Sequence, residues 1–528
     1  MLMSEVVDKP AESPNAEPAA PTVEVYAVYG VEPEIQAYAM AKYSRSALSM
    51  KESLREISQQ KAEKFLNTFY FQYGHRSIAD LAHIALAIER LSILAAIVVA
   101  DEQRWDGQER STRYQDFRKS GYYTPNFEDL ASQTLYRETI ESLFSAYEKV
   151  SQQTFEYLAS ITPRPAEMKL DAYERTLRAR AFDISRYLLP LATNTSLGEI
   201  VNARTLETQV AHLLSQPHKE VRNLGTLLKQ AALSPAYNAN EESLRALVAE
   251  IRAVSPEIAD RAESALLREV RVAPTLVKYA DPNIYEIESR RELRQAAADL
   301  MRGANIEPAP LVDLIDNDLK GSEGLEIELA TTLLYGHCHY SYRQLRHTVE
   351  ASGEARRHEV IDLGLRHRGR HDEMPRSFSA GQQFCFDILM DIGGFRDMHR
   401  HRRCIQILQP FTNLHGYEVP EGLAEAGLLP QYDSAMTNAH EAFVHVQQAG
   451  LAEQAGYVLP LGTRTRALFK MDFAEALYIA ELRSTPAGHF SYRRIAWEMY
   501  QAVARKHPAL AQYFRVADIN EPVNLLQR

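Results

Sequence analysis

The feature that most constrains this fold is a set of short motifs that occurs twice, in the same order. Four segments of the first half each resemble one segment of the second half. The pairs are AKYSRS (41–46) with VKYADP (277–282), FQYGHRS (71–77) with LLYGHCH (333–339), GYYTP (121–125) with GYEVP (416–420), and RYLLPL (186–191) with GYVLPL (456–461). Because such an order is not expected by chance, it predicts a duplicated unit.

The repeat sets the expected domain boundaries. A chain of 528 residues is too long for one ordinary core, and two domains are the natural division. We place the first repeat at 23–245, a helical connection at 246–269 and the second repeat at 270–528. Residues 1–22 are rich in Pro, Ala and acids and are expected to form a disordered leader. The second copy is longer between its second and third motifs, which we attribute to an exposed, polar loop at about 347–380.

Helical patterns dominate both halves. Apolar residues at three-and-four spacing predict helices at 45–73, 76–100, 128–160, 166–187, 197–215, 434–449 and 468–482. Shorter strand-like runs occur at 23–30 and 384–392. Many helices with a few strands in each repeat predict an α+β fold.

Composition excludes several classes of protein. A net charge of −11 gives no general attraction to nucleic acid or to an anionic membrane. The three cysteines (Cys338, Cys385 and Cys404) are too few for a disulfide framework and suit a reducing compartment. The longest apolar run, near 93–100, is far shorter than a membrane span, and the N-terminus lacks a signal pattern. We therefore expect a cytoplasmic protein.

The segment HRHRRC (399–404) carries a dense basic cluster, with Arg396 close by. Such a cluster is repulsive unless an anion or an acidic partner neutralises it. The planar fork of arginine suits phosphate oxygens. The alternative is a solvated basic strip that pairs with Asp391 and Asp397.

A second basic segment, QERSTRY (108–114), lies almost three hundred residues upstream. In an extended segment, Ser111 and Arg113 would point the same way, and a hydroxyl beside an arginine makes a small phosphate cradle. A surface turn is the alternative. A third segment, GHCHY (336–340), places His, Cys and His in a row, which is not a zinc-ligand spacing. We therefore expect no metal site there.

Taken in order, the motifs YGH, RHR, S-x-RY, LPL, NAR and LR resemble those of the flavin-dependent thymidylate synthases. The resemblance covers both repeats. It implies helix-rich α+β units, each with a small, mainly antiparallel sheet. It also implies binding of FAD and of deoxyuridine monophosphate (dUMP) at sites that several subunits build in a tetramer.

The family residues are divided between the two repeats. The first repeat retains Ser111, Arg113 and Tyr114 of S-x-RY, and the second retains RHR at 400–402. The complementary positions differ from the family. In repeat one, Asp101, Glu102 and Gln103 occupy the place of RHR, and Leu214 occupies the place equivalent to Arg483. In repeat two, Pro410 occupies the place of the serine, Gly456 that of Arg186, and Asp472 and Ala474 those of Asn202 and Arg204. This division predicts one composite site that both repeats share.

The resemblance also implies a reaction, the reductive methylation of dUMP to dTMP. Methylenetetrahydrofolate would supply the carbon unit, and NADPH would reduce the flavin. Arg400 would be catalytic by polarising the uracil ring. FAD would be bound by Arg400, His401, Arg402, Asn202 and Arg204, and the nucleotide by Ser111, Arg113, Arg186 and Arg483. A homodimer of two-repeat chains would mimic the family tetramer, with the site formed within one chain or across two.

Some residues depart from the family pattern and support other functions. Asp397 replaces a frequent glutamine, while Leu81 and Arg343 replace a family histidine. One alternative is therefore a catalytically silent homologue that binds flavin or a nucleotide. Another is an RNA- or anion-binding protein that uses residues 343–403. Aromatic residues are sparse in that segment, so nucleic acid is not an expected partner.

Overall fold

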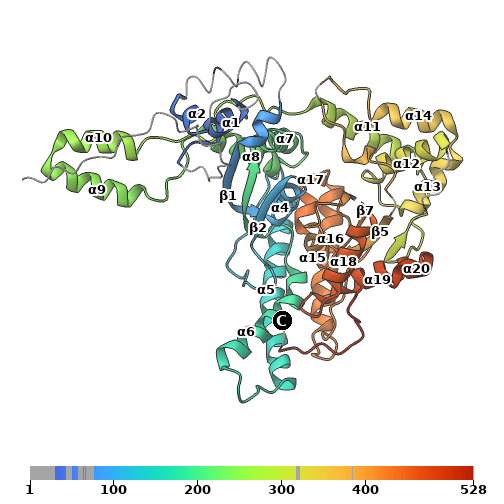
Figure 1. Cartoon of the computed structure of the whole chain (residues 1–528). Coiled ribbons are helices and arrows are strands. Elements are labelled where there is room, and N and C mark those ends of the chain that lie inside the picture. Colours follow the sequence, from blue (N-terminus) through green and yellow to red (C-terminus); the bar gives the residue numbers. More distant parts are fainter. Residues whose placement is uncertain are drawn as a thin grey trace, which may run out of the picture.

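The computed structural model describes residues 30–42, 50–56, 64, 66, 76–316, 321–370, 372–382 and 384–526. The expected leader and nearly all of the expected strand at 23–30 lie outside these residues, as does most of the expected helix at 45–73. Helices predominate (Figure 1), and two small antiparallel sheets lie among them. The α+β fold with a repeated unit is confirmed. In the described part of the chain, no helix is long and apolar enough to span a membrane.

The first half contains one three-stranded sheet with strand order β1-β3-β2. Its elements are α1 (Pro33–Lys42), α2 (Met50–Glu56), η2 (Arg76–Leu81), β1 (His83–Ser92), α4 (Ile93–Ala100), β2 (Trp105–Glu109), α5 (Leu130–Ile161), α6 (Leu170–Ser185), η3 (Arg186–Leu188), β3 (Asn194–Asn202), α7 (Ala203–Leu214) and α8 (Lys219–Leu233).

The second half repeats this plan with one additional edge strand, in the order β4-β5-β7-β6. Its elements are α11 (Ile284–Leu300), β4 (Val312–Leu314), α12 (Gly321–Tyr335), α13 (Tyr342–Ala351), α14 (Glu354–Leu363), η4 (Arg376–Phe378), β5 (Phe384–Asp391), α15 (Ile392–Met398), β6 (Ile405–Leu408), α16 (Leu429–Gln448), α17 (Ala452–Ala455), η5 (Gly456–Val458), β7 (Arg464–Met471), α18 (Phe473–Ser484), α19 (Phe490–Lys506) and α20 (Pro508–Ala511). Strands β1, β3 and β2 therefore correspond to β5, β7 and β6.

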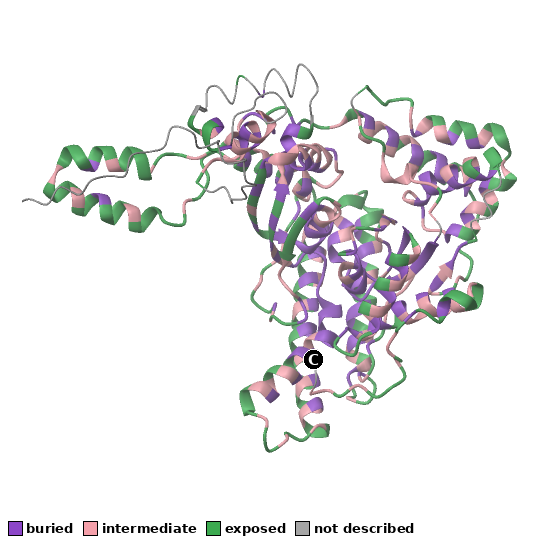
Figure 2. Ribbon diagram, viewed as in Figure 1, coloured by how far each residue is buried: buried purple, intermediate pink, exposed green. Residues whose placement is uncertain are grey.

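Between the halves, α9 (Glu241–Val254) and α10 (Pro256–Leu266) form a hairpin that projects from the body (Figure 1). The proposed repeat boundary at 245 falls inside α9. The hairpin is largely exposed (Figure 2), with only Val248 and Ala259 buried. Arg252 joins the two helices through ion pairs to Asp260 and Glu263, each at 2.6 Å.

In each repeat, two strands run directly into helices without a turn. The last strand residue, or for β7 the residue just after it, is extended and caps the helix that follows, which is the geometry an N-cap requires. These caps are Ser92, Asn202, Asp391 and Asp472, whose side chains accept hydrogen bonds from backbone N–H groups of the next helix's first turn. The helices expected at 197–215 and 468–482 are therefore wrong in their first part, which is a strand. The helix expected at 76–100 is wrong at 83–92, where β1 lies between the short helix η2 and α4.

The two repeats meet around a pseudo-twofold axis at their LPL segments. Pro190 and Pro460 form an isolated antiparallel bridge. Leu191 N–H donates to the Leu459 carbonyl at 2.9 Å, and Leu461 N–H donates to the Leu189 carbonyl at 2.9 Å. Helices α5 and α16 pack against each other beside this junction. The halves therefore form one body with a shared core.

The segment 347–380 differs from the exposed loop that was expected. It contains the end of α13, all of α14 and the short helix η4. Val349 of α13 and Val360 of α14 are buried against α12 in a separate small core. Their apolar side chains explain why this segment folds rather than staying extended.

Candidate functional site

Side chains from the two repeats converge on a small hollow of about 20 Å³. The first repeat supplies Ser111 and Arg113 from the segment after β2, and Arg186 from η3. The second repeat supplies Asp397 from α15 and Arg400 from the turn after it. The composite arrangement expected from the sequence therefore forms within a single chain.

Arg113 is buried and fully engaged by protein groups. Its Nε donates to Asp183 Oδ1 at 2.7 Å, and its terminal nitrogens donate to the Tyr492 hydroxyl at 2.7 Å and the Ala487 carbonyl at 3.2 Å. Burial opposes the charge, but Asp183 outweighs burial and raises the pKa of Arg113. Arg113 is a permanent cation that an internal carboxylate already neutralises.

Arg186 has the same arrangement on the other side of the hollow. Its side chain is 2% exposed, and both terminal nitrogens donate to Asp397 Oδ2 at 3.1 Å. Its Nε finds no acceptor among the described residues. Burial raises the pKa of Asp397, but the guanidinium groups of Arg186 and Arg113 outweigh burial and hold that pKa below its usual value. Asp397 therefore acts as an internal counterion.

Arg400 is the exception among these arginines. Its side chain is exposed, and within the described chain it makes no hydrogen bond or ion pair. Its neighbours in the basic cluster pair with acids other than the two expected. Arg402 lies 2.9 Å from Asp106, and Arg403 lies 2.6 Å from Asp472. Arg400 is thus the cation best placed to receive a ligand.

The interpretation as a strip paired with Asp391 and Asp397 is wrong. Asp391 instead accepts from Gly394 N–H and from the Ser491 hydroxyl, and Asp397 is bound by Arg186. Arg396 pairs with Glu109 of β2. The cluster is neutralised mainly by the opposite repeat, which sequence spacing could not reveal.

His401 and Arg483 form a pair beside Tyr492, which contacts Arg113 of the hollow. Arg483 Nε donates to His401 Nε2 at 2.7 Å, and His401 Nδ1 lies 3.5 Å from Glu475. Burial lowers the pKa of His401, which makes the imidazole a neutral acceptor. The Arg483 guanidinium lies 5.4 Å from the Tyr492 ring centre, and that of Arg113 lies 5.6 Å from it. Tyr492 thus links the two arginines, a role that sequence reasoning missed.

The remaining expected residues lie outside this hollow. Asn202 caps α7 by accepting from Thr205 N–H at 2.8 Å. Arg204 pairs with Asp80 at 3.3 Å and with Glu373 at 3.6 Å. Arg402 stacks on Trp105 of β2, 5.3 Å from the ring centre. The structure therefore brings Ser111, Arg113 and Arg186 together with Arg400. Arg483 is linked to them through Tyr492, whereas Asn202 and Arg204 lie elsewhere.

A wider cavity of about 330 Å³ lies at the mirror position. Counting from the caps Ser92 and Asp391, Ile97, Val98 and Asp101 occupy the positions of Arg396, Asp397 and Arg400, and all three line this cavity. Asp101 is bound by Arg376 at 2.5 Å. Counting from the caps of α7 and α18 also places Leu213, rather than Leu214, opposite Arg483. At the mirror position Ile97, Val98 and Asp101 thus stand in place of two arginines and an aspartate, and the cavity is wider.

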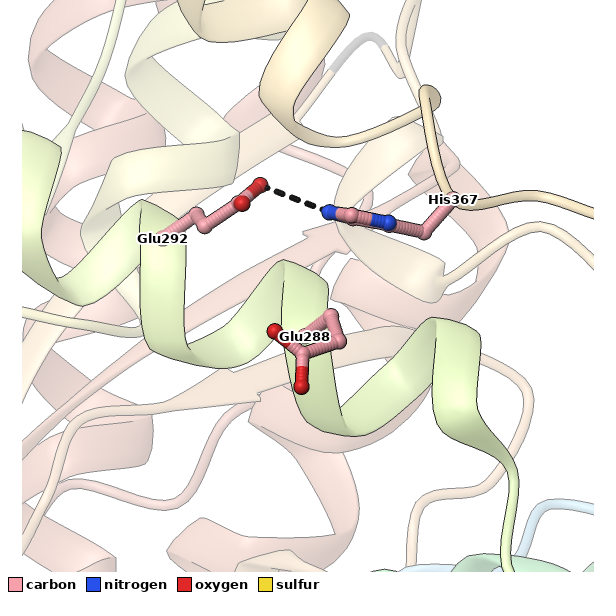
Figure 3. A group of neighbouring side chains, drawn as sticks. All are labelled: Glu288, Glu292 and His367. Carbon is pink, nitrogen blue, oxygen red and sulfur yellow. Dashed lines mark hydrogen bonds and ion pairs between the residues drawn. The ribbon is translucent and has the colours of Figure 1, made fainter.

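Glu288, Glu292 and His367 form a group with the composition of a metal site (Figure 3). His367 Nε2 lies 3.0 Å from Glu292. Two arginines already neutralise the same carboxylates, since Arg291 lies 2.6 Å from Glu288 and Arg366 binds Glu292. Arg366 is also the main reason that the pKa of Glu292 is lowered. We therefore interpret this group as a surface ion-pair network.

Comparison with known proteins decides the family. The family described as thymidylate synthase complementing protein matches residues 28–233 and 326–509, one segment in each repeat. The chain belongs to this family. It resembles a UPF0159 protein of Chlamydia muridarum (26% identity, over 94% of this chain and 92% of that protein) and one of Chlamydia pneumoniae (27%, over 95% and 93%).

Relatives with a named activity match a smaller part of the chain. A flavin-dependent thymidylate synthase of Clostridium tetani is 26% identical over 37% of this chain and 76% of its own length. A solved structure of Thymidylate Synthase X from Helicobacter pylori with FAD and dUMP covers 38% of this chain and 88% of its own, with 16% identity and a TM-score of 0.25. The thymidylate synthase relatives thus match part of the chain, whereas the UPF0159 relatives match nearly all of it.

Proposed function

We propose that this protein is a FAD-dependent thymidylate synthase-like enzyme that converts dUMP to dTMP at one composite site per chain. Methylenetetrahydrofolate would donate the carbon unit and NADPH would supply the reducing equivalents. The observation that supports this proposal is the convergence of Ser111, Arg113 and Arg186 of one repeat with Arg400 of the other. Those positions match the family's nucleotide-binding and catalytic motifs.

The residues around the hollow fit an anionic ligand. Arg400 exposes a guanidinium without an acidic partner in the described chain, and the Nε atoms of Arg186 and Arg396 are buried without acceptors. Charge-assisted hydrogen bonds to phosphate are among the strongest that proteins make. A hollow of about 20 Å³ has room for little more than a water molecule. The side chain of Arg400 or the segment at Ser111 must therefore move before a nucleotide enters.

The proposed mechanism gives each side chain one task. The flavin, when bound, would supply a hydride to the nucleotide ring. Arg400 would stabilise the negative charge that develops on a ring carbonyl oxygen during that step. Ser111 and Arg113 would hold the phosphate. His401 is neutral and would fix the orientation of Arg483 rather than neutralise a phosphate itself.

One observation favours a second function, that of a catalytically silent nucleotide-binding homologue. Asp183 and Asp397 already occupy the guanidinium groups of Arg113 and Arg186. A ligand phosphate would have to compete with these carboxylates or to bind through Arg400 alone. Under this alternative the protein would hold a flavin or a nucleotide without turning over dUMP.

The first test is the absorbance spectrum of the purified protein. The second is an assay of dTMP formation from dUMP, methylenetetrahydrofolate and NADPH with FAD added. A flavin spectrum with dTMP formation supports the enzyme. A flavin spectrum or dUMP binding without dTMP identifies the silent homologue. Absence of flavin and of dUMP binding overturns both.

Matched variants locate the site. Arg402→Ala, like Arg400→Ala, should abolish flavin retention, because each lost charge-assisted contact is worth roughly 1.5–3 kcal/mol. Gln103 occupies the position that corresponds to Arg402 in the other repeat, and Gln103→Ala should have little effect. Equal losses from Arg402→Ala and Gln103→Ala would contradict a site that is specific to one repeat combination.

A further inference from the structure

A second site lies on the mirror side of the molecule, between α7, α8 and α11. Here a hollow of about 660 Å³ is lined by four arginines, Arg222, Arg290, Arg291 and Arg294, and by no acidic residue. A basic lining of this kind is notable in a chain whose net charge is −11. The proposed synthase activity uses none of these residues.

Three of these arginines are partly occupied by the protein. Arg222 donates to the Gln216 carbonyl at 2.9 Å, and Arg290 donates to the Ser215 carbonyl at 2.7 Å, both just beyond the end of α7. Arg290 also binds Glu286, and Arg291 binds Glu288 at 2.6 Å. Carbonyl groups satisfy hydrogen bonds without neutralising a full charge. Among the described residues, no carboxylate pairs with Arg222.

Arg294 is left with no counterion at all in the described chain. Its side chain is exposed, and the described residues give it neither an ion pair nor a hydrogen bond. Burial lowers the pKa of His337 to about 3 and that of His218 to about 4, and Arg290 and Arg294 push both values in the same direction. These histidines therefore add no positive charge, and the positive potential of the site comes from its arginines. A bound anion would offset this positive potential.

The basic hollow adjoins the 330 Å³ mirror cavity, because Gln216 and Arg290 line both. The mirror cavity has mainly apolar walls, which include Ile97, Leu293 and Leu333. Such walls suit the faces of a planar ring.

Two buried polar atoms of the mirror cavity lack hydrogen bonds, Ser289 Oγ and His399 Nε2. His399 Nδ1 lies 2.8 Å from Gln406 Oε1 and so carries the proton, which makes Nε2 an acceptor. Burial lowers the pKa of His399 and outweighs the opposing effect of Asp101, whose Oδ1 lies 3.5 Å from Nε2, so the ring is neutral. Buried polar atoms without partners are uncommon, and a ligand N–H would satisfy this one.

We propose that this mirror site binds a nucleoside monophosphate. The base lies in the apolar cavity, where His399 Nε2 accepts from a ring N–H and Ser289 bonds to the base edge. The phosphate lies against Arg294 and Arg290 in the basic hollow. This site uses residues of α11 that have no role in the composite site, and it does not depend on that site's activity.

The test is isothermal titration calorimetry of the full chain with the four ribonucleoside 5′-monophosphates, their nucleosides and inorganic phosphate. At least one monophosphate should bind more tightly than both its nucleoside and phosphate. Arg294→Gln should weaken that binding about tenfold, or about 1.4 kcal/mol. Arg245→Gln on α9 removes the same charge from another exposed helix and should change nothing.

Two further variants separate the parts of the proposal. Ser377 lines the mirror cavity, and Ser377→Trp should fill it and reduce monophosphate binding to the level of phosphate alone. Arg400→Ala should leave binding intact, which distinguishes this site from the composite one.

Several outcomes would overturn the mirror site. These are equal affinities for Arg294→Gln and Arg245→Gln, no binding of any monophosphate, or binding of an RNA oligonucleotide in place of the monophosphates. Arg294 is exposed, so its variant should fold, and a thermal melt confirms this before titration.

Discussion

Helices α4 and α15 occupy equivalent places in the two repeats, yet they build opposite kinds of cavity. Where α15 carries Arg396 and Asp397, α4 carries Ile97 and Val98. The charged version draws acids and arginines from both repeats into a hollow of about 20 Å³, whereas the apolar version leaves about 330 Å³. Equivalent backbones therefore do not imply equivalent sites, because the side chains and neighbouring segments around each helix differ.

The largest expected effect comes from breaking the buried ion pair at the small hollow of the composite site. Arg186→Met removes the partner of Asp397 and should lower the free energy of unfolding by about 3 kcal/mol, as breaking a buried ion pair does. Urea denaturation measures this change. Adding Asp397→Val, the residue found at the mirror position, should restore most of the loss. A double variant as unstable as the single one would show that charge pairing does not explain the difference between the cavities.

Glu199 of β3 allows a second comparison between the repeats, because Phe469 of β7 occupies the equivalent position. Both Glu199 oxygens are buried, and burial raises the pKa of this carboxyl to about 7 against the opposing effect of Gln209. The folded protein thus binds this proton more tightly than the unfolded chain. The stability that it contributes is present below about pH 4.5 and is lost as the pH rises through about 7.

Glu199→Gln removes this titration. Wild type and variant should have similar stability at pH 5, whereas the variant should be more stable at pH 8 by about 2–3 kcal/mol. Chemical denaturation at the two pH values measures the difference. The interpretation fails if that difference does not change with pH.

A smaller effect should follow when Arg483 is replaced by the residue found at the equivalent position of the first repeat. Arg483→Leu copies Leu213 and removes the donor to His401 Nε2. The pKa of His401, which burial and then Arg483 lower, should rise, and NMR titration of the imidazole measures it. Binding of dUMP should weaken about tenfold. An unchanged His401 titration would separate Arg483 from the site.

The smallest effect should come from deleting the α9–α10 hairpin, which lies in the connection between the two repeats. Helices α9 and α10 pack mainly on each other, and the Pro235–Arg271 bridge holds the chain together at their base. Replacing residues 241–266 with a short Gly/Ser linker should therefore leave the melting temperature nearly unchanged. A large fall would show that the hairpin supports one of the repeats.

The sequence predicted the duplicated plan because its motifs mark the turns and junctions that the fold repeats. Gly121 and Gly416 both adopt positive φ (70° and 66°), and both LPL segments form the junction. The strands β1, β3 and β7 were missed because a cap such as Ser92 replaces the turn that normally separates a strand from a helix. Continuous apolar patterns across these junctions favour a helix throughout.

The composite site was predicted through its arginines and not through its acids. Motif order brought Arg113, Arg186 and Arg400 together, and the structure does the same. No spacing rule connects Arg113 to Asp183 or Arg186 to Asp397, since both pairs depend on tertiary packing. The wide mirror cavity was also beyond sequence reasoning, because lost motifs leave no pattern to detect.

The reciprocal backbone pairing of Leu189 with Leu461 and of Leu191 with Leu459 has a genetic consequence. In a symmetric oligomer of identical subunits, every substitution appears in all copies, so no site can change without its symmetry mates. Here the dyad lies inside one polypeptide, and each codon affects one side only. Selection can therefore act on the two pockets of this chain separately while the junction keeps them in register.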